Sequence, residues 1–256
     1  MKQRLTVPAL SAALGLAGFL LRLLQNRTGF EADTGLPIPG NVPSILLPIL
    51  LLAAVVLLLL AARALPKGPQ PFPAPLREKQ PLLLTVLVLG VFLMAASGIW
   101  SVLGASSAAS MQYLTADGLM LMEVPTVSGT SARLMGLLAI VTAVSAFPAV
   151  AAICREGISP LPVLAAPVCL LARLVLAYRV HSVDPVLADY YPELLSLILL
   201  ILAFYRLSGF AASCGSLRLY SVYAGLTAVL SLTLLADGIT PAALLALGVT
   251  TGAAIT

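Results

Sequence analysis

The chain has 256 residues, of which 60% are hydrophobic and 9% are charged, and its mean hydropathy is +1.07. A water-soluble core cannot enclose so large an apolar fraction, so the composition predicts an integral membrane protein. The formal charge is +4, but the Lys and Arg residues lie in loops and at the ends of apolar runs. No basic stripe with interleaved aromatic residues is present, and we exclude nucleic acid as a partner.

Seven apolar windows have the length of a transmembrane helix, which needs about 20 residues. The first window begins like a signal peptide, with Lys2 and Arg4 before an apolar run. The run continues to Leu24 without a small-residue cleavage site, so we expect it to remain as the first span. The seven windows are residues 5–24, 43–64, 81–104, 133–153, 161–178, 189–207 and 217–236.

An eighth, shorter apolar run covers residues 240–255. It opens with Thr240, a suitable N-cap, and Pro241, whose fixed φ suits the first helical position. The sequence therefore predicts an all-α, polytopic membrane helix bundle, folded as a single transmembrane domain over residues 1–256, with seven transmembrane helices and a short eighth.

The distribution of basic residues predicts the orientation, because Lys and Arg are retained on the cytoplasmic side. With these spans, nine of the 14 Lys and Arg residues fall on the side of the amino terminus and five on the other side. We therefore expect a cytoplasmic amino terminus. In a bacterium, the membrane would be the plasma (inner) membrane.

Two loops have unusual composition. Residues 66–81 contain six prolines in sixteen residues, which favours an extended connector over a helix. Its Lys67, Arg77 and Lys79 are candidate contacts for anionic lipid headgroups or for a partner protein. The outer loop 105–132 is rich in Ser, Ala and Met, and we expect its segment 111–122 to form a short interfacial helix or to cap a cavity.

Polar residues are densest between residues 170 and 199, where two of the predicted helices are joined. Counted from Asp184 at the turn, Arg173 lies about eleven residues before it and Glu193 about nine after it, so both reach similar depths. A charge below the lipid surface is usually paired, faces a cavity or extends to the interface. Arg173 and Glu193 are thus a candidate ion pair, which either clamps two helices or belongs to a solute site.

Arg22 is a third candidate for the same roles. Its surroundings, LLRLLQNR, are similar to the LARLVLAYR segment around Arg173, and acidic residues follow both segments. The similarity indicates either a duplication of the chain or the shared requirements of an outer membrane interface. On the same helix, Ala9, Ala13 and Ala17 form a small-residue face that we expect to pack against another helix.

The sequence contains no recognisable catalytic or cofactor motif. It has one histidine and lacks the HExxH, GxSxG and GK(S/T) patterns, so we expect neither an enzyme nor a bound cofactor. A membrane-embedded enzyme is the weakest of the alternatives. The three cysteines include no CxxC pair that would indicate a metal site.

Two functional hypotheses remain. The first is a permease, or a substrate-binding membrane subunit, for a small and anionic solute that enters from the outer face. Arg173 and Arg22 would attract this solute, and Glu193 would hold Arg173 while the site is empty. The alternative is a non-transporting membrane sensor, scaffold or assembly factor that acts through its proline-rich cytoplasmic loop and its long outer loop.

Overall fold

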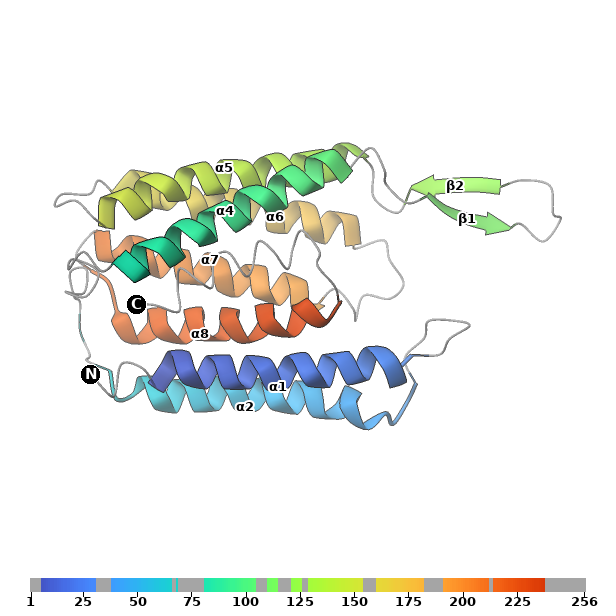
Figure 1. Cartoon of the computed structure of the whole chain (residues 1–256), viewed down its shortest axis with the longest axis horizontal. Coiled ribbons are helices and arrows are strands. Elements are labelled where there is room, and N and C mark those ends of the chain that lie inside the picture. Colours follow the sequence, from blue (N-terminus) through green and yellow to red (C-terminus); the bar gives the residue numbers. More distant parts are fainter. Residues whose placement is uncertain are drawn as a thin grey trace.

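A computed structural model gives the fold of the chain (Figure 1). The residues that it describes are 6–30, 38–65, 68, 81–104, 110–114, 121–125, 129–153, 160–181, 191–211 and 214–237. A helix occurs at each of the seven predicted windows. The helices are α1 (Thr6–Thr28), α2 (Val42–Ala62), α4 (Pro81–Gly104), α5 (Gly129–Ile153), α6 (Pro160–His181), α7 (Tyr191–Ala211) and α8 (Leu217–Leu234).

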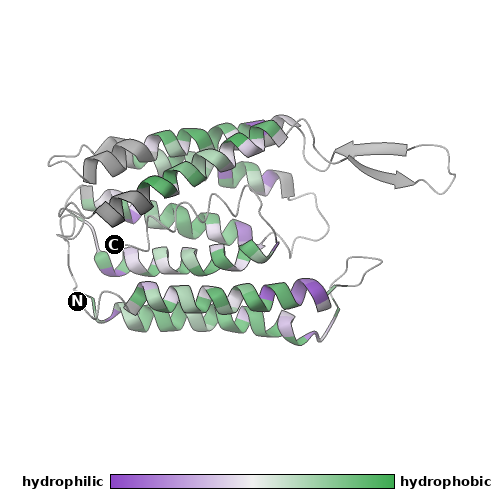
Figure 2. Ribbon diagram, viewed as in Figure 1, coloured by the Kyte–Doolittle hydropathy of each residue, from purple (hydrophilic) through white to green (hydrophobic). Residues whose placement is uncertain are grey.

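By length and composition, four segments are suited to crossing a membrane: Val7–Thr28, Val42–Ala62, Tyr191–Phe210 and Leu217–Asp237. Shorter apolar stretches occur in α4 and α5. Large apolar side chains such as Leu52 point outward, and Figure 2 shows hydrophobic residues along the helices with hydrophilic residues nearer their ends. The chain is therefore a membrane-type helical protein.

Packing follows the order of the chain, except that the first two helices close onto the last. Helix α4 packs on α5, α5 on α6, α6 on α7, and α7 on α8, while α8 also packs on both α1 and α2. Consecutive helices run in opposite directions (Figure 1). Helices α1 and α8 are parallel, so both end at the same end of the bundle.

The halves of the chain do not repeat one arrangement. A duplication that relates Arg22 to Arg173 would relate α1, α2 and α4 to α6, α7 and α8. Helix α7 packs on α8. In contrast, α2 and α4 lie on opposite sides of the bundle (Figure 1) and are not among its extensively packed pairs in the described part of the chain. The fold therefore gives no support to the duplication.

Two apolar clusters form the core, and α7 contributes to both. The first joins α1, α2, α7 and α8 and includes Leu58, Phe210 and Val229. The second joins α4, α5, α6 and α7 and includes Met94 and Leu170. Because most of α8 is buried, this helix is the centre of the first cluster.

Small residues of α1 allow its close approach to α8. Methyl groups added at Gly15 or Gly18 would meet Leu232 and Thr233, at 2.6 Å from Leu232 Cδ1 in the first case. The spacing of Ser11, Gly15 and Gly18 places them on one helical face. The predicted packing face of Ala9, Ala13 and Ala17 is therefore wrong: Ala9 and Ala13 are exposed and Ala17 is only half-buried. Almost every α1 residue is apolar or small, so the sequence did not distinguish the two faces.

A short connection positions α2 against α1. Asn41 is the N-cap of α2, and its side-chain oxygen accepts a hydrogen bond from the Ser44 backbone N–H at 3.4 Å. The same side chain donates through Nδ2 to the Thr28 carbonyl oxygen at 2.6 Å. Pro43 follows within the first helical turn, where its missing N–H costs nothing. Asn41 thus joins the end of α1 to the start of α2.

The outer loop contains strands, which corrects the expected short helix over residues 111–122 and is the exception to an all-α fold. β1 (Ser110–Leu114) pairs antiparallel with β2 (Leu121–Pro125), with Gln112 opposite Glu123. The hairpin projects beyond the helix ends (Figure 1). The sequence between the strands includes Asp117-Gly118, a dipeptide typical of β-hairpin turns, which favours a hairpin over a helix here.

Two predicted features lie outside the described residues. These are the eighth apolar run, residues 240–255, and the proline-rich loop with Lys67, Arg77 and Lys79. Both stay predictions.

The α1–α8 register predicts a specific disulfide. A Cβ at position 18 would lie 3.5 Å from Thr233 Cβ, and bridged cysteines have Cβ–Cβ distances of about 3.5–4.5 Å. With Cys154, Cys169 and Cys214 replaced by Ala, the pair Gly18→Cys and Thr233→Cys should cross-link under mild oxidation. A protease site inserted within residues 69–80 provides the readout, because the fragments stay joined on a non-reducing gel.

The matched control is Ala13→Cys with Thr233→Cys, because Ala13 lies on the exposed face of the same helix. This pair should not cross-link. Equal cross-linking of the two pairs, or none at positions 18 and 233, would contradict the packing.

Candidate functional site

Buried charge gathers at one end of the bundle. At this end α1, α4, α6 and α8 finish and α2, α5 and α7 begin, and the β-hairpin projects from it (Figure 1). Arg22 lies in the last turns of α1, Arg173 in the second half of α6 and Glu193 in the first turn of α7. All three candidate residues from the sequence are thus at the same end, although they do not form one cluster.

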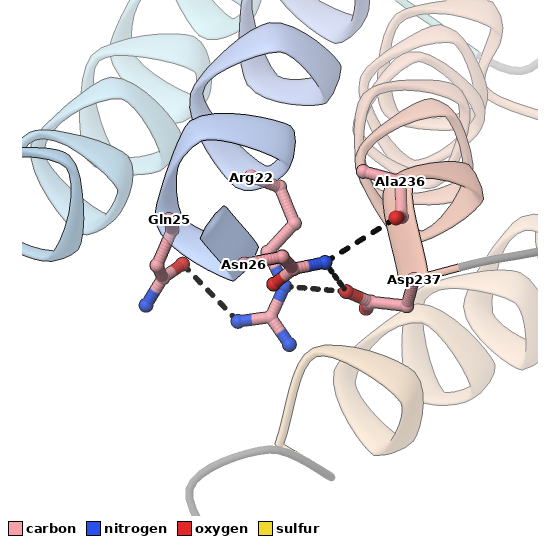
Figure 3. A network of polar contacts seen from close by, with 5 residues as sticks. All are labelled: Arg22, Gln25, Asn26, Ala236 and Asp237. Atoms are coloured by element: carbon pink, nitrogen blue, oxygen red, sulfur yellow. Dashed lines mark hydrogen bonds and ion pairs between the residues drawn. The ribbon is translucent and has the colours of Figure 1, made fainter. Parts of the chain in front are cut away.

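Arg22 is held by the end of α8 (Figure 3). Its Nε donates to Asp237 Oδ1 at 2.7 Å, and its Nη1 donates to Gln25 Oε1 at 3.1 Å. Asn26 Nδ2 donates to the same Asp237 oxygen at 2.8 Å and to the Ala236 carbonyl at 3.2 Å. One carboxylate therefore ties two successive turns of α1 to the 3₁₀ turn η3 (Leu235–Asp237), which continues α8.

This cluster is a helix clamp. Arg22 is only 7% exposed, and its partner is a carboxylate on a helix that packs along α1. A buried charge with a hydrogen-bonded counter-ion avoids most of the cost of desolvation. The sequence identified Arg22 but not its partner. Asp237 follows the seventh apolar window directly, on the same predicted side as Arg22, and that position was the available indication.

Arg173 has no such counter-ion in contact among the described residues. It is 4% exposed, and its Nη1 donates to the Met135 carbonyl oxygen of α5 at a long 3.4 Å. Its Nε is buried and makes no hydrogen bond within the described part of the chain. A guanidinium has five N–H donors, so most of this group's capacity is unused. Buried polar groups without partners are costly and rare in native structures.

Glu193 lies near Arg173 but does not bind it. The carboxylate acts electrostatically on the guanidinium, yet no ion pair joins these two described residues. The predicted Arg173–Glu193 ion pair is therefore absent. Arg173 is directed to the α5 backbone at Met135, while Glu193 belongs to the first turn of α7, where the helix dipole favours a carboxylate.

Several buried hydroxyl groups are satisfied within their own helices, whereas the buried Ser44 Oγ has no hydrogen-bond partner among the described residues. In α8, Thr227, Ser231 and Thr233 donate to the carbonyls four residues earlier, at 2.8, 2.6 and 2.9 Å. Thr142 and Ser196 likewise donate to carbonyls of α5 and α7. These hydroxyls do not require water or a partner, so they do not mark a polar path through the core.

Arg206 provides a comparison. Its Nε is also buried without a hydrogen bond to the described residues. The residue as a whole is only half-buried, and its guanidinium carbon lies 5.9 Å from the centroid of the Tyr205 ring. Arg206 is therefore partly solvated and in contact with an aromatic face. Arg173 has neither form of stabilisation in the described structure, which distinguishes it as the candidate binding residue.

No cluster of three or more His, Cys, Asp or Glu residues that could hold a metal ion occurs in the described segments. Cys169 and Cys214 are free thiols. The search of protein-family models, of curated proteins and of solved structures found no match to the chain.

The clamp predicts a stability effect for Asp237. Replacing it with Ala removes the hydrogen bonds from Arg22 and Asn26 and leaves the guanidinium without its counter-ion. A hydrogen bond to a charged group contributes about 1.5–3 kcal/mol, so the free energy of unfolding should fall by about that amount or more. Equilibrium unfolding in detergent measures it.

Arg27→Ala is the matched control, because Arg27 is an exposed arginine one turn further along α1. It should change stability by less than about 0.5 kcal/mol. The double variant Arg22→Ala/Asp237→Ala should lose less than the sum of the two single losses. Strict additivity would show that the ion pair does not join the helices.

Proposed function

We propose that this protein is a permease, or a substrate-binding membrane subunit, whose small anionic solute binds at Arg173. The supporting observation is the state of the guanidinium. It is nearly fully buried, and within the described part of the chain it has no counter-ion in contact and makes one long hydrogen bond to a carbonyl. An anion at this position would supply the missing partner for the unused N–H groups.

Arg173 has the chemistry for such a solute. A guanidinium is planar and remains charged, and its parallel N–H groups match the two oxygens of a carboxylate or phosphate. Charged residues inside membrane helices usually face a cavity or mark a solute path. The site would lie between α5, α6 and α7, because Arg173 contacts the α5 backbone and is close to Glu193 of α7.

We further propose that all seven described helices cross the membrane, with the amino terminus in the cytoplasm. Their alternating directions (Figure 1) and the excess of Lys and Arg on the side of the amino terminus support this topology. In a bacterium the membrane would be the plasma membrane. Arg173 and Arg22 would then be near the outer face, and solute would enter there.

In this proposal, the three candidate residues have different roles. Arg173 binds the solute. Arg22 is paired with Asp237 and acts as a clamp that fixes α1 against α8. Glu193 lies at the mouth of the site, where its charge acts on Arg173 without neutralising it by direct contact. We propose no catalytic step for any of them.

A second candidate is a membrane sensor, scaffold or assembly factor. The β-hairpin favours it, because β1 and β2 project beyond the helices as an isolated two-stranded element (Figure 1). A hairpin leaves backbone groups at its outer edges available for pairing with another strand. The proline-rich loop with Lys67, Arg77 and Lys79 would be its cytoplasmic contact for a partner protein or anionic lipid.

Binding of simple anions tests the first candidate. The purified chain in detergent is titrated with propionate, butyrate and phosphate, and its apparent melting temperature is recorded. A ligand that binds only the folded state stabilises it, by about 2.7 kcal/mol at 100 times Kd. We expect a shift with at least one anion in the wild type and no shift in Arg173→Gln.

The control is Arg133→Gln, an exposed arginine at the same end of the bundle, which should retain the shift. A wild type that responds neither to these anions nor to amino compounds that carry the same carboxylate would overturn the proposal. If Arg173→Gln were then strongly destabilised, Arg173 would be a structural residue and the second candidate would replace the first.

A further inference from the structure

Resting on the proposed anion site, we propose that its solute is a zwitterion that bridges two opposite charges. The carboxylate of the solute would bind Arg173 of α6, and its ammonium group would bind Glu193 of α7. The proposal thus names the solute class as small amino acids or related compounds in which one amine and one carboxylate are charged.

Neither charge has a partner in contact among the described residues. The Arg173 guanidinium makes one long hydrogen bond, to the Met135 carbonyl, and its Nε makes none with the described residues. Glu193 accepts a hydrogen bond from Ser196 only through its backbone oxygen. Its carboxylate forms no hydrogen bond or ion pair with the described residues. A ligand with one charge would leave one of these groups unpaired.

Different helices keep the two charges apart. Arg173 extends from α6 toward the α5 backbone, and Glu193 is fixed in the first turn of α7. Each charge is close enough to act on the other, yet they do not meet. Opposite charges that are held apart on two helices suit a ligand that carries the complementary pair.

A zwitterion also preserves the charge balance of the site. A buried site that holds one cation and one anion is neutral, and a zwitterion keeps it neutral when water is displaced. A simple anion would add net negative charge beside Glu193, and like charges in a medium of low dielectric repel strongly. Glu193 therefore discriminates against simple anions while it attracts the amine of a zwitterion.

The positions of the residues also set the orientation of the solute. Arg173 is buried in the second half of α6, whereas Glu193 is half-buried in the first turn of α7. The carboxylate of the solute would thus point inward and its ammonium group toward the surface.

The test uses two pairs of probes that differ in an amine. Alanine is compared with propionate, and 4-aminobutyrate with butyrate, by the shift in apparent melting temperature of the purified full chain. Alanine and 4-aminobutyrate differ in the distance between their amine and carboxylate. The distance between the charges of Arg173 and Glu193 selects one of these two lengths. In the wild type, at least one amino compound should bind about tenfold more tightly than its matched anion, a difference of about 1.4 kcal/mol.

The variants locate the two contacts. Glu193→Gln should reduce the affinity for the amino compound to that for its matched anion or below it, because the partner of the amine is lost. Arg173→Gln should abolish binding of every probe. Arg133→Gln, which changes an exposed arginine at the same end, should leave all affinities unchanged.

Each outcome decides between the proposals. If propionate or butyrate binds the wild type at least as well as its amino counterpart, the zwitterion proposal is overturned while the anion site stands. If no probe binds, both proposals fall. Because the wild-type comparison alone separates these results, a Glu193→Gln variant that fails to fold does not prevent a decision.

Discussion

The need for every polar group to find a partner inside an apolar bundle governs this structure. Outward-facing side chains are apolar, so polar groups at the helix contacts depend on the protein itself. Thr227, Ser231 and Thr233 meet this requirement with carbonyls of their own helix. Arg22 meets it through Asp237. Arg173 Nε does not meet it within the described residues, and neither do Ser44 Oγ and Arg206 Nε; of the two arginines, only Arg173 is fully buried and lacks an aromatic contact there.

The packing of α1 on α8 connects the fold to its polar end. Gly15 and Gly18 allow the helices to approach closely, and the same parallel register brings Arg22 to Asp237. Helix α8 then lies at the centre of one core cluster, while α7 links this cluster to the one that surrounds α6. One continuous set of helix contacts therefore links the Arg22–Asp237 ion pair to Arg173. Arg22 has its counter-ion in contact, whereas Arg173 has none among the described residues.

The helices could be predicted because an apolar run of about 20 residues is a strong and specific pattern. The packing faces of the helices could not be predicted, because a helix that is apolar all round has little periodicity. We expected Ala13 to face a neighbouring helix, whereas Gly15 and Gly18 make the contact. The candidate arginines stood out because charge is rare in such runs. Their hydrogen-bond partners could not be identified from the sequence. Asp237 lies 215 residues from Arg22, and Arg173 binds a backbone carbonyl, which no residue type reveals.

Accessibility of position 173 tests the central claim most directly. In a cysteine-free chain reconstituted in membranes, Arg173→Cys is treated with a membrane-impermeant, negatively charged thiol reagent at the face where α6 ends. Thr233→Cys is the reference, since Thr233 is buried and its hydroxyl is satisfied within α8. We predict rapid labelling at 173 and little at 233. Equal protection of both positions would show that Arg173 faces a dry interface and would contradict the account.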